Sequence, residues 1–144
     1  MSLTRKAHAY VTHEATEASA LLAFRHCDDP AAGIQVPRGT VDPAEDPAAT
    51  VLREVCEECG LCDARLVGLI ATDIVAQSDD PTWHWERFFF HLVAPDAPDA
   101  WEHSVTGAGE DNGLVFSFFW LPRERLGDLW PGFGDYAHLV LGKR

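Results

Sequence analysis

The segment from Asp46 to Gly60 carries both the start and the stop signals of one helix, and it constrains the fold more than any other part of the sequence. Asp46 accepts hydrogen bonds from the free N–H groups of a first helical turn, and Pro47 has the backbone angle that the first helical position needs. Gly60 readily takes the left-handed conformation that ends a helix. We therefore expect a helix from Pro47 to about Cys59.

Strand-like segments lie on both sides of this helix. Residues 6–12 alternate between polar and apolar, and other segments are short apolar or aromatic runs bounded by turn residues. The expected strands are residues 6–12, 20–25, 34–36, 65–76, 84–94 and 114–121. Residues 122–126 are expected to start a short helix, and residues 135–141 are expected to form a C-terminal helix. Strands that mix with helices in this way predict an α/β or α+β layered domain.

Two segments are expected to be loops. Pro43 argues against a continuous helix or a central strand between Gly39 and Glu45. The segment from Pro95 to Gly113 is rich in Pro, Gly, Asp and Glu. It is predicted to be a long mobile loop, of the kind that is usually functional in a compact domain.

Length and composition indicate one globular domain. The chain has 144 residues, of which 47% are hydrophobic and 24% charged, so we expect a single domain over residues 1–144. The formal charge of −12 repels nucleic-acid backbones and anionic membranes, and neither is expected as a partner. No stretch approaches the roughly 18 apolar residues of a membrane helix, and no signal peptide is recognisable. A cytoplasmic location is expected.

Three carboxylates fall on one stripe of the expected helix. Glu54, Glu57 and Glu58 stand at the i, i+3 and i+4 positions, which share a helix face. Like charges at this spacing repel, and a hard divalent cation such as Mg²⁺ offsets the repulsion by binding carboxylate oxygens. Without such a cation, the stripe is simply a solvated acidic face. The opposite stripe is expected to dock on a sheet, and its residues are Ala48, Leu52, Val55, Cys56 and Cys59.

The order of residues around this stripe resembles the Nudix box. Gly39 is followed after five residues by Glu45, and after seven more by the run REVCEECGL at Arg53–Leu61. A loop, a capped helix and a glycine stop fall where the family has its loop–helix–loop. The resemblance implies the family's α/β/α sandwich, in which a mixed β-sheet lies between the box helix and a C-terminal helix.

The resemblance also implies a function. Nudix hydrolases cleave a pyrophosphate bond in a nucleoside diphosphate linked to another group, such as a dinucleoside polyphosphate, a nucleotide sugar or a (d)NTP. The implied cofactor is Mg²⁺, with Mn²⁺ as a substitute. The implied metal ligands are the three carboxylates and one backbone carbonyl of the box: Glu54, Glu57, Glu58 and Gly39. Arg53 and Glu45 are implied to pair with each other and to hold the loop against the helix. The oligomeric state stays open, although dimers are common in the family.

A carboxylate is expected to take the proton from the attacking water. In the family this base is a box glutamate, here Glu54 or Glu58, or a residue from a loop late in the chain. Glu110, next to Asp111, is the first candidate outside the box, and Glu102 is the second. A solvated loop carboxylate is the alternative interpretation of both.

Arg38, Trp83 and Trp85 are the expected substrate contacts. Arg38 stands where family members that act on dinucleoside polyphosphates carry a cation, and a guanidinium suits phosphate oxygens. Trp83 and Trp85 alternate onto one face of a strand, where an indole can stack on a nucleobase. A surface arginine and an ordinary packed sheet are the alternatives.

Two other functions compete with hydrolysis. A Nudix-fold nucleotide-binding or regulatory module would keep the shape without turnover, but it has no need of three like charges held together. Cys56, Cys59 and Cys62 have the short spacing of a thiolate metal or iron–sulfur site, but a second pair of ligands is missing. We expect reduced thiols, because three clustered cysteines and a distant Cys27 are unlike the disulfide framework of a small secreted domain.

Overall fold

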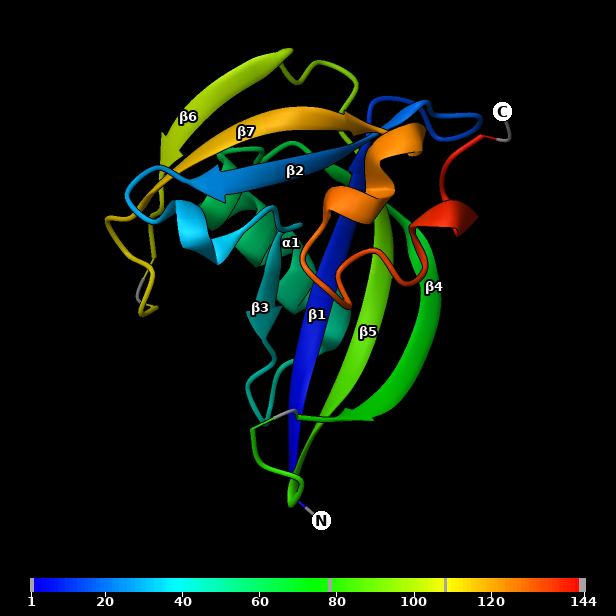
Figure 1. Cartoon of the computed structure of the whole chain (residues 1–144). Coiled ribbons are helices and arrows are strands. Elements are labelled where there is room, and N and C mark those ends of the chain that lie inside the picture. Colours follow the sequence, from blue (N-terminus) through cyan, green and yellow to red (C-terminus); the bar gives the residue numbers. More distant parts are fainter. Residues whose placement is uncertain (1, 78, 108, 143–144) are drawn as a thin grey trace.

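Two β-sheets and one α-helix make up most of the structure, a computed structural model that describes residues 2–77, 79–107 and 109–142 (Figure 1). The larger sheet has the strand order β3-β1-β5-β4, and the smaller sheet has the order β2-β7-β6. The larger sheet contains β1 (Ser2–Thr12), β3 (Arg38–Thr40), β4 (Arg65–Ala76) and β5 (Trp83–Val93). The smaller sheet contains β2 (Ala20–His26), β6 (Ala100–Ser104) and β7 (Val115–Pro122), and the helix is α1 (Pro47–Cys59). Because β1 and β5 run parallel and their other neighbours antiparallel, the larger sheet is mixed, as predicted.

The helix α1 occupies the predicted residues. The side chain of Asp46 accepts a hydrogen bond from the N–H of Ala48 at 3.2 Å, and Pro47 takes the first helical position. Gly60 ends the helix in the left-handed region, with a φ of 76°. In the described part of the chain, no helix is long and apolar enough to cross a membrane.

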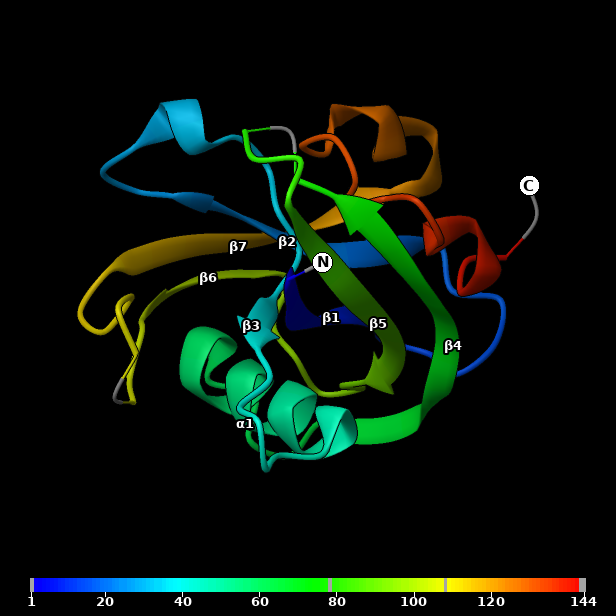
Figure 2. The same ribbon diagram turned by 90° about the horizontal axis from the view of Figure 1, so that it is seen from below.

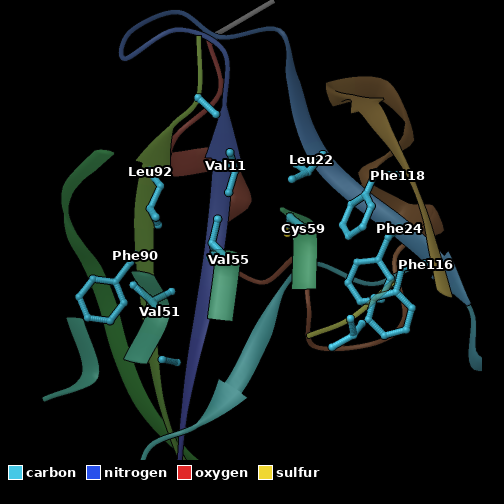
Figure 3. Packing of buried hydrophobic residues seen from close by; sticks show 14 of the residues in the cluster. Val11, Leu22, Phe24, Val51, Val55, Cys59, Phe90, Leu92, Phe116 and Phe118 are labelled. Carbon is cyan, nitrogen blue, oxygen red and sulfur yellow. The ribbon is translucent and has the colours of Figure 1, made fainter. Parts of the chain in front are cut away.

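The helix packs on one face of the larger sheet, beside the smaller sheet (Figure 2). Alternation along β1 sends Ala7, Ala9 and Val11 to this face, where they form one core cluster with Val51 and Val55 of α1. Figure 3 shows this cluster together with aromatic side chains of the smaller sheet, which are Phe24, Phe116 and Phe118. The core therefore fixes α1 against both sheets.

The C-terminal segment covers the opposite face of the larger sheet. Tyr10 and Phe89 form a second core cluster with Phe133, and the Tyr10 hydroxyl donates a hydrogen bond to the Phe133 carbonyl oxygen at 2.7 Å. Between β7 and residue 142, where the described chain ends, the helical structure consists of two short 3-10 helices, Arg123–Asp128 and Ala137–Leu139. The mixed α/β architecture is confirmed, with short turns in place of a second long helix.

The predicted C-terminal helix at 135–141 is wrong, because the segment contains only one 3-10 turn. Its backbone is held by side chains from distant strands. Asp135 accepts a hydrogen bond from Arg87 at 2.9 Å, and the Tyr136 hydroxyl donates to Asp73 at 2.7 Å. These long-range contacts override a local helical pattern.

Two predicted loops contain strands. The residues 38–40 form β3 beside β1, whereas the expected strand at 34–36 makes only isolated bridges. The strand β6 lies within the predicted loop at 95–113, where it pairs with β7 and where Trp101 stacks on Phe118 with ring centroids 5.0 Å apart. The composition of residues 95–113 predicted a loop, but pairing with β7 makes part of this segment a strand.

Cys56 and Cys62 form a disulfide bond, so the expectation of reduced thiols is wrong for this pair. The turn at Gly60 brings the chain back toward the helix, and the two Cα atoms lie 4.3 Å apart. The disulfide uses two of the three thiols that a thiolate metal site would need. Of the other two cysteines, Cys27 is free and exposed and Cys59 is free and buried.

The buried face of α1 is rotated relative to the predicted one. Val51 is completely buried, whereas Leu52, which was expected to dock on the sheet, is 39% exposed. The rotation also turns Glu58 inward, where it is only 5% exposed. One of the three stripe carboxylates is therefore buried rather than solvated.

Candidate active site

A cavity of about 870 Å³ opens along α1 and the short strand β3, and it is also lined by β1, by parts of β2 and β7 and by the loop before β7. It brings together most of the sequence-predicted site residues, which are Arg38, Gly39, Arg53, Glu54, Glu57, Glu58 and Glu110. Other predicted residues do not contribute to the lining that the described residues form, and these are Glu45, Trp83, Trp85 and Glu102. The glutamate stripe and Arg38 thus face one cavity.

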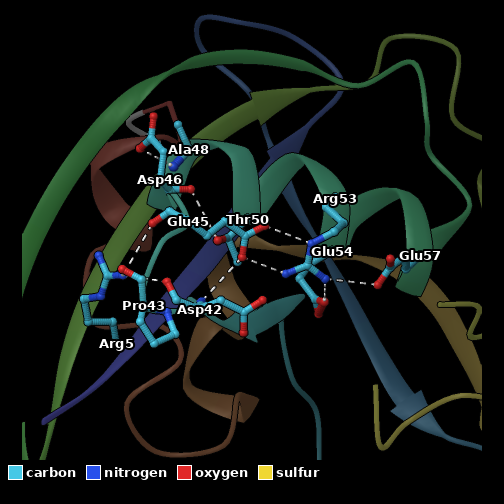
Figure 4. A network of polar contacts seen from close by, with 10 residues as sticks. All are labelled: Arg5, Asp42, Pro43, Glu45, Asp46, Ala48, Thr50, Arg53, Glu54 and Glu57. Carbon is cyan, nitrogen blue, oxygen red and sulfur yellow. Dashed lines mark hydrogen bonds and ion pairs between the residues drawn. The ribbon is translucent and has the colours of Figure 1, made fainter. Parts of the chain in front are cut away.

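Arg53 connects the loop before α1 to the glutamate stripe (Figure 4). It donates hydrogen bonds from Nε and Nη2 to the two oxygens of Glu45, both at 3.0 Å. Its Nη1 donates to Glu54 at 2.9 Å and to Glu57 at 3.3 Å. The hydrogen bonds from Arg53 lower the pKa of Glu45 to about 2. One arginine therefore holds the loop and orients two of the stripe carboxylates.

The Glu58 carboxylate is buried without a full set of partners. Its Oε1 atom has no hydrogen-bond partner among the described residues. Burial, together with the charges of Glu54 and Asp111, raises the pKa of Glu58 well above its ordinary value. Burial also raises the pKa of Glu54. A buried, unpaired carboxylate costs free energy, and a bound cation would offset that cost.

Gly39 allows the backbone of β3 to approach Glu54 closely. A Cβ atom built at position 39 would overlap the Glu54 carboxylate. A side chain at position 39 would therefore force the Glu54 side chain to move. The glycine of the box therefore brings a backbone segment and a carboxylate to the same wall of the cavity.

Contacts from β6 and the loop that follows it hold the C-terminal end of α1. The N–H of Thr106 donates to the Glu57 carbonyl oxygen at 3.0 Å, and Nε2 of His103 lies 3.1 Å from the same oxygen. The indole N–H of Trp101 donates to the Cys59 carbonyl oxygen at 2.9 Å. These contacts satisfy helix-end carbonyls that have no partner within the helix. The sequence does not predict them, because they join residues more than forty positions apart.

Two cations line the cavity on the side of β1 and β3. The Arg38 guanidinium carbon lies 4.9 Å from the ring centroid of Trp85 and 4.8 Å from that of Phe133. Lys6 donates a hydrogen bond from Nζ to the Thr40 hydroxyl at 2.8 Å. Burial lowers the pKa of Lys6, and the nearby positive charge of Arg38 lowers it further. Sequence reasoning missed Lys6, whose one signal was its place on the polar face of the first strand.

The two predicted tryptophans are placed differently. Trp85 contacts Arg38 from outside the cavity lining, whereas Trp83 is 39% exposed at the start of β5, where it pairs with Ser2. Neither indole is part of the cavity lining that the described residues form. Glu110 and Asp111 line the cavity from an exposed loop, while Glu102 lies outside the lining on β6.

Aromatic side chains form another part of the cavity lining. Phe24 stacks on Phe116 with ring centroids 4.3 Å apart, and His26 lies 4.5 Å from Phe116. Gln35 stands beside them and donates a hydrogen bond from its amide to the Ala32 carbonyl oxygen at 3.0 Å. The sequence pattern identifies Phe116 as a core residue, and it is indeed buried. Its second role as a cavity wall depends on β2 and β7 being neighbours, which a single sequence does not reveal.

The box residues fit a hard divalent cation, although their side chains are not converged on one point. Among the described residues, no three His, Cys, Asp or Glu side chains are gathered in an arrangement that could hold a metal ion. Arg53 forms ion pairs with Glu54 and Glu57 in this arrangement. The donor set itself is suitable, since carboxylate oxygens are the ligands that Mg²⁺ prefers. The unpaired Oε1 of Glu58 supplies a buried acceptor that a cation would satisfy.

Comparison with known proteins identifies the fold. The chain resembles the E. coli dihydroneopterin triphosphate pyrophosphohydrolase with a TM-score of 0.63 and 14% identity, over 97% of this chain and 98% of that one. A NUDIX hydrolase from Nitrosomonas europaea gives a TM-score of 0.63 and 17% identity, over 98% and 93% of the two chains. A UDP-X diphosphatase gives a TM-score of 0.59 and 15% identity, over 87% of this chain and 53% of that one, so this chain spans about half of its length. A search of the curated proteins found no match.

The family assignment rests on the sequence of nearly the whole chain. The family model for the NUDIX domain matches residues 3–140. The match confirms the resemblance of the Gly39–Leu61 segment to the Nudix box and, with it, the predicted class of enzyme, a Nudix-type pyrophosphohydrolase. The sequence, the mixed α/β fold and the box at the cavity wall lead to one conclusion: this chain belongs to the NUDIX domain family.

Proposed function

We propose that the protein is a metal-dependent hydrolase that cleaves a pyrophosphate bond in a nucleoside diphosphate linked to another group, and that residues 1–144 act as a single catalytic domain. The observation that carries the proposal is the buried, unpaired Oε1 of Glu58 in a cavity that also holds Glu54 and the cation Arg38. The acidic side chains of the box and the cation Arg38 line the same cavity. This arrangement suits a polyanionic substrate that binds together with a cation.

The box residues would hold Mg²⁺, with Mn²⁺ as a substitute. The proposed ligands are the stripe carboxylates and the backbone carbonyl at the box glycine: Glu54, Glu57, Glu58 and Gly39. When bound, the ion neutralises phosphate charge and lowers the pKa of a coordinated water. Arg53 would position Glu54 and Glu57, and its pair with Glu45 would keep the loop in place.

Glu110 is the proposed general base from outside the box. Glu54 and Glu58 are the alternatives within the box. Glu110 lines the cavity, whereas Glu102 does not, and this placement favours Glu110 over Glu102. Its exposed carboxylate can accept a proton from an attacking water.

The substrate would lie across the cavity. Arg38 is the proposed phosphate contact, because its guanidinium is free of carboxylate partners among the described residues and lines the cavity. The nucleobase would lie against His26 and Phe116 rather than against Trp83 or Trp85, since only the first two line the cavity. The names of two similar structures, a UDP-X diphosphatase and a dihydroneopterin triphosphate pyrophosphohydrolase, support a pyrophosphate bond as the target.

A product-resolved screen tests the proposal. The purified protein is incubated with dinucleoside polyphosphates, nucleotide sugars, ADP-ribose and (d)NTPs, in Mg²⁺ and in EDTA, and the products are separated. We expect hydrolysis of at least one class in Mg²⁺ and none in EDTA. Binding in Mg²⁺ without any product would favour a Nudix-fold binding or regulatory module instead.

Glu54→Gln and Glu58→Gln are expected to lower the Mg²⁺-dependent rate by roughly two to four orders of magnitude. Each change keeps the size of the side chain but removes the charge that binds the ion. In EDTA, Glu58→Gln should melt at the same or a slightly higher temperature, because it removes a buried negative charge. Glu14→Gln, at an exposed turn, is the matched control and should keep the full rate. Wild-type rates in both box variants would contradict the metal assignment.

We also propose a homodimer as the assembly. The strand β4 is an edge of the larger sheet, and it exposes apolar side chains, which are Leu66, Val67, Leu69 and Ile74. An open edge with apolar side chains favours pairing with a second copy, and this strip is almost free of charge in a chain of net charge −12. Light scattering after size exclusion tests the assembly, and a monomer across the micromolar range would overturn it.

A further inference from the structure

His103 lies outside the cavity but contacts the helix that carries the proposed metal ligands. It is half-buried on β6 and is not part of the cavity lining that the described residues form. Its Nε2 atom lies 3.1 Å from the Glu57 carbonyl oxygen. A carbonyl oxygen can only accept, so Nε2 carries a hydrogen and donates it. His103 is therefore bonded to the main chain of a proposed metal ligand.

The place of the imidazole depends on the turn that ends α1. A Cβ atom built on Gly60 would come within 2.9 Å of the His103 ring. Gly60 also has a φ of 76°, a conformation that favours glycine. The glycine that ends the helix thus leaves the space in which the imidazole reaches the Glu57 carbonyl oxygen.

The loop after β6 lies on the same glutamate. The N–H of Thr106 donates to the Glu57 carbonyl oxygen at 3.0 Å. A Cβ atom built on Gly107 would overlap the Glu57 carboxylate, so the loop backbone lies against this side chain. The same loop carries Glu110 and Asp111 to the cavity. Glu57 is therefore the contact point between the acidic stripe and the loop that holds the proposed general base.

Hydrogen bonds connect the two ends of this loop. The N–H of Val105 donates to the Leu114 carbonyl oxygen at 2.8 Å, and the N–H of Leu114 donates to the Asp111 carbonyl oxygen at 2.9 Å. A shift of the backbone at Thr106 would therefore be transmitted to Asp111 and to its neighbour Glu110.

We propose that His103 is a positioning residue, which fixes the Glu57 carboxylate relative to the loop that carries Glu110. The proposal rests on the proposed function and adds to it a residue that acts through Glu57. Without the imidazole N–H, the Glu57 carbonyl oxygen keeps its bonds from Thr106, but the end of the helix and the loop lose a shared anchor. Partners behind a metal ligand set its orientation, and the loss of one typically costs about ten- to a hundredfold in metal affinity or activity.

The test replaces His103 by Leu, which cannot donate a hydrogen bond, and by Gln, whose amide N–H can donate to the same oxygen. Titration calorimetry without nucleotide should give a Mg²⁺ affinity about tenfold lower for His103→Leu, and within about threefold of the wild type for His103→Gln. At saturating Mg²⁺, kcat on the best substrate should fall about tenfold in His103→Leu. KM should change by less than about threefold, because His103 lies outside the cavity lining.

His13→Leu is the matched control. The Nε2 atom of His13 lies 3.0 Å from the Ala97 carbonyl oxygen, and this half-buried imidazole is also outside the cavity lining. Each Leu variant loses one contact between an imidazole and a carbonyl, so each should melt in EDTA about 1–6 °C below the wild type. Only His103→Leu should lose Mg²⁺ affinity.

A double-mutant cycle with Glu57→Gln distinguishes positioning from a general loosening of the fold. If His103 acts through the Glu57 carboxylate, His103→Leu should weaken Mg²⁺ binding by less than about twofold once that carboxylate is gone. An equal, tenfold loss in both backgrounds would overturn the proposal, because His103 would then act by a route that bypasses Glu57.

The outcomes separate the two proposals. If the wild type binds Mg²⁺ but hydrolyses no nucleotide, the proposed function fails, and the Mg²⁺ affinities still decide the role of His103. If the wild type hydrolyses a nucleotide and His103→Leu keeps the wild-type Mg²⁺ affinity and kcat, His103 is not a positioning residue. A failure of His103→Gln to restore them would show the same.

Discussion

At the scale of single residues, the geometry of the site depends on Gly39, which has no side chain. Gly39 lies on β3 opposite Ala7, and its missing Cβ leaves the space that the Glu54 carboxylate occupies. Glu54 in turn is oriented by Arg53. A small change at position 39 therefore acts directly on a proposed metal ligand without altering any charge.

Gly39→Ala should weaken Mg²⁺ binding by roughly ten- to a hundredfold, because the new methyl group displaces the Glu54 carboxylate. The overpacked contact should also lower the free energy of unfolding in EDTA by about 1–3 kcal/mol. Mg²⁺ titration calorimetry and urea unfolding in EDTA measure the two effects. Gly127→Ala is the control, because a Cβ there meets nothing within 4 Å. Unchanged Mg²⁺ affinity in Gly39→Ala would show that Glu54 is not held by this contact.

The box residues could be recognised from the sequence because the family motif is defined by the spacing of residues along the chain. Arg53, Glu54, Glu57 and Glu58 fall within six positions of one helix. Lys6 and Phe116 reach the same cavity from strands more than a hundred positions apart, and their pattern of polarity is that of any strand. The acidic wall and Arg38 could therefore be predicted, whereas Lys6 and the aromatic wall could not.

At the scale of elements, local signals predicted the helix and failed for segments that depend on distant partners. Asp46, Pro47 and Gly60 determine α1 through their own backbone preferences. By contrast, β6 forms because it pairs with β7. The face of α1 that docks was also misjudged, because the turn after Gly60 joins Cys56 to Cys62 instead of leaving Cys56 in an apolar contact.

The Cys56–Cys62 bond should stabilise the end of α1 by closing a short loop. Cys62→Ser is expected to lose about 2 kcal/mol of unfolding free energy under oxidising conditions, the loop-entropy value for so short a ring. Wild-type protein in dithiothreitol should lose the same amount, and the variant should lose nothing further. Urea unfolding with and without reductant measures this, with Cys27→Ser as the control because Cys27 is free and exposed. A variant as stable as the oxidised wild type would mean that the bond contributes nothing.

At the scale of the whole molecule, one polar network ties the C-terminal segment to the larger sheet. Arg87 on β5 donates to Asp73 on β4 at 2.8 and 2.6 Å, and to Asp135 at 2.9 Å. The Tyr136 hydroxyl donates to Asp73 at 2.7 Å. The Arg87 side chain is only 7% exposed, so solvent screens the network weakly. The C-terminal segment, held by this network, covers the second core cluster in place of the expected C-terminal helix.

Asp73 should make the stability of the whole fold sensitive to acid. Hydrogen bonds from Arg87, and from Tyr136, lower the pKa of Asp73 in the folded protein. Its stabilisation is therefore complete above the ordinary Asp pKa of about 3.9 and is lost as the pH falls through the lower folded pKa. Asp73→Asn removes the charge at every pH. At pH 7 the variant should lose about 2–4 kcal/mol of unfolding free energy, since Arg87 keeps only the half-exposed Asp135 as a charged partner.

The difference between Asp73→Asn and the wild type should shrink as the pH falls through the lowered folded pKa of Asp73, because the wild-type carboxylate then becomes protonated. Urea unfolding in EDTA at pH 7 and at an acidic pH below the ordinary Asp pKa of about 3.9 measures it. Asp128→Asn breaks the exposed pair with Arg125 and should cost less than about 1 kcal/mol at either pH. Hydrogen exchange at residues 133–141 should rise in Asp73→Asn, because that segment is fastened through Asp135 and Tyr136 to the same cluster. An equal loss at both pH values would show that Asp73 acts through its shape and hydrogen bonds rather than through its charge.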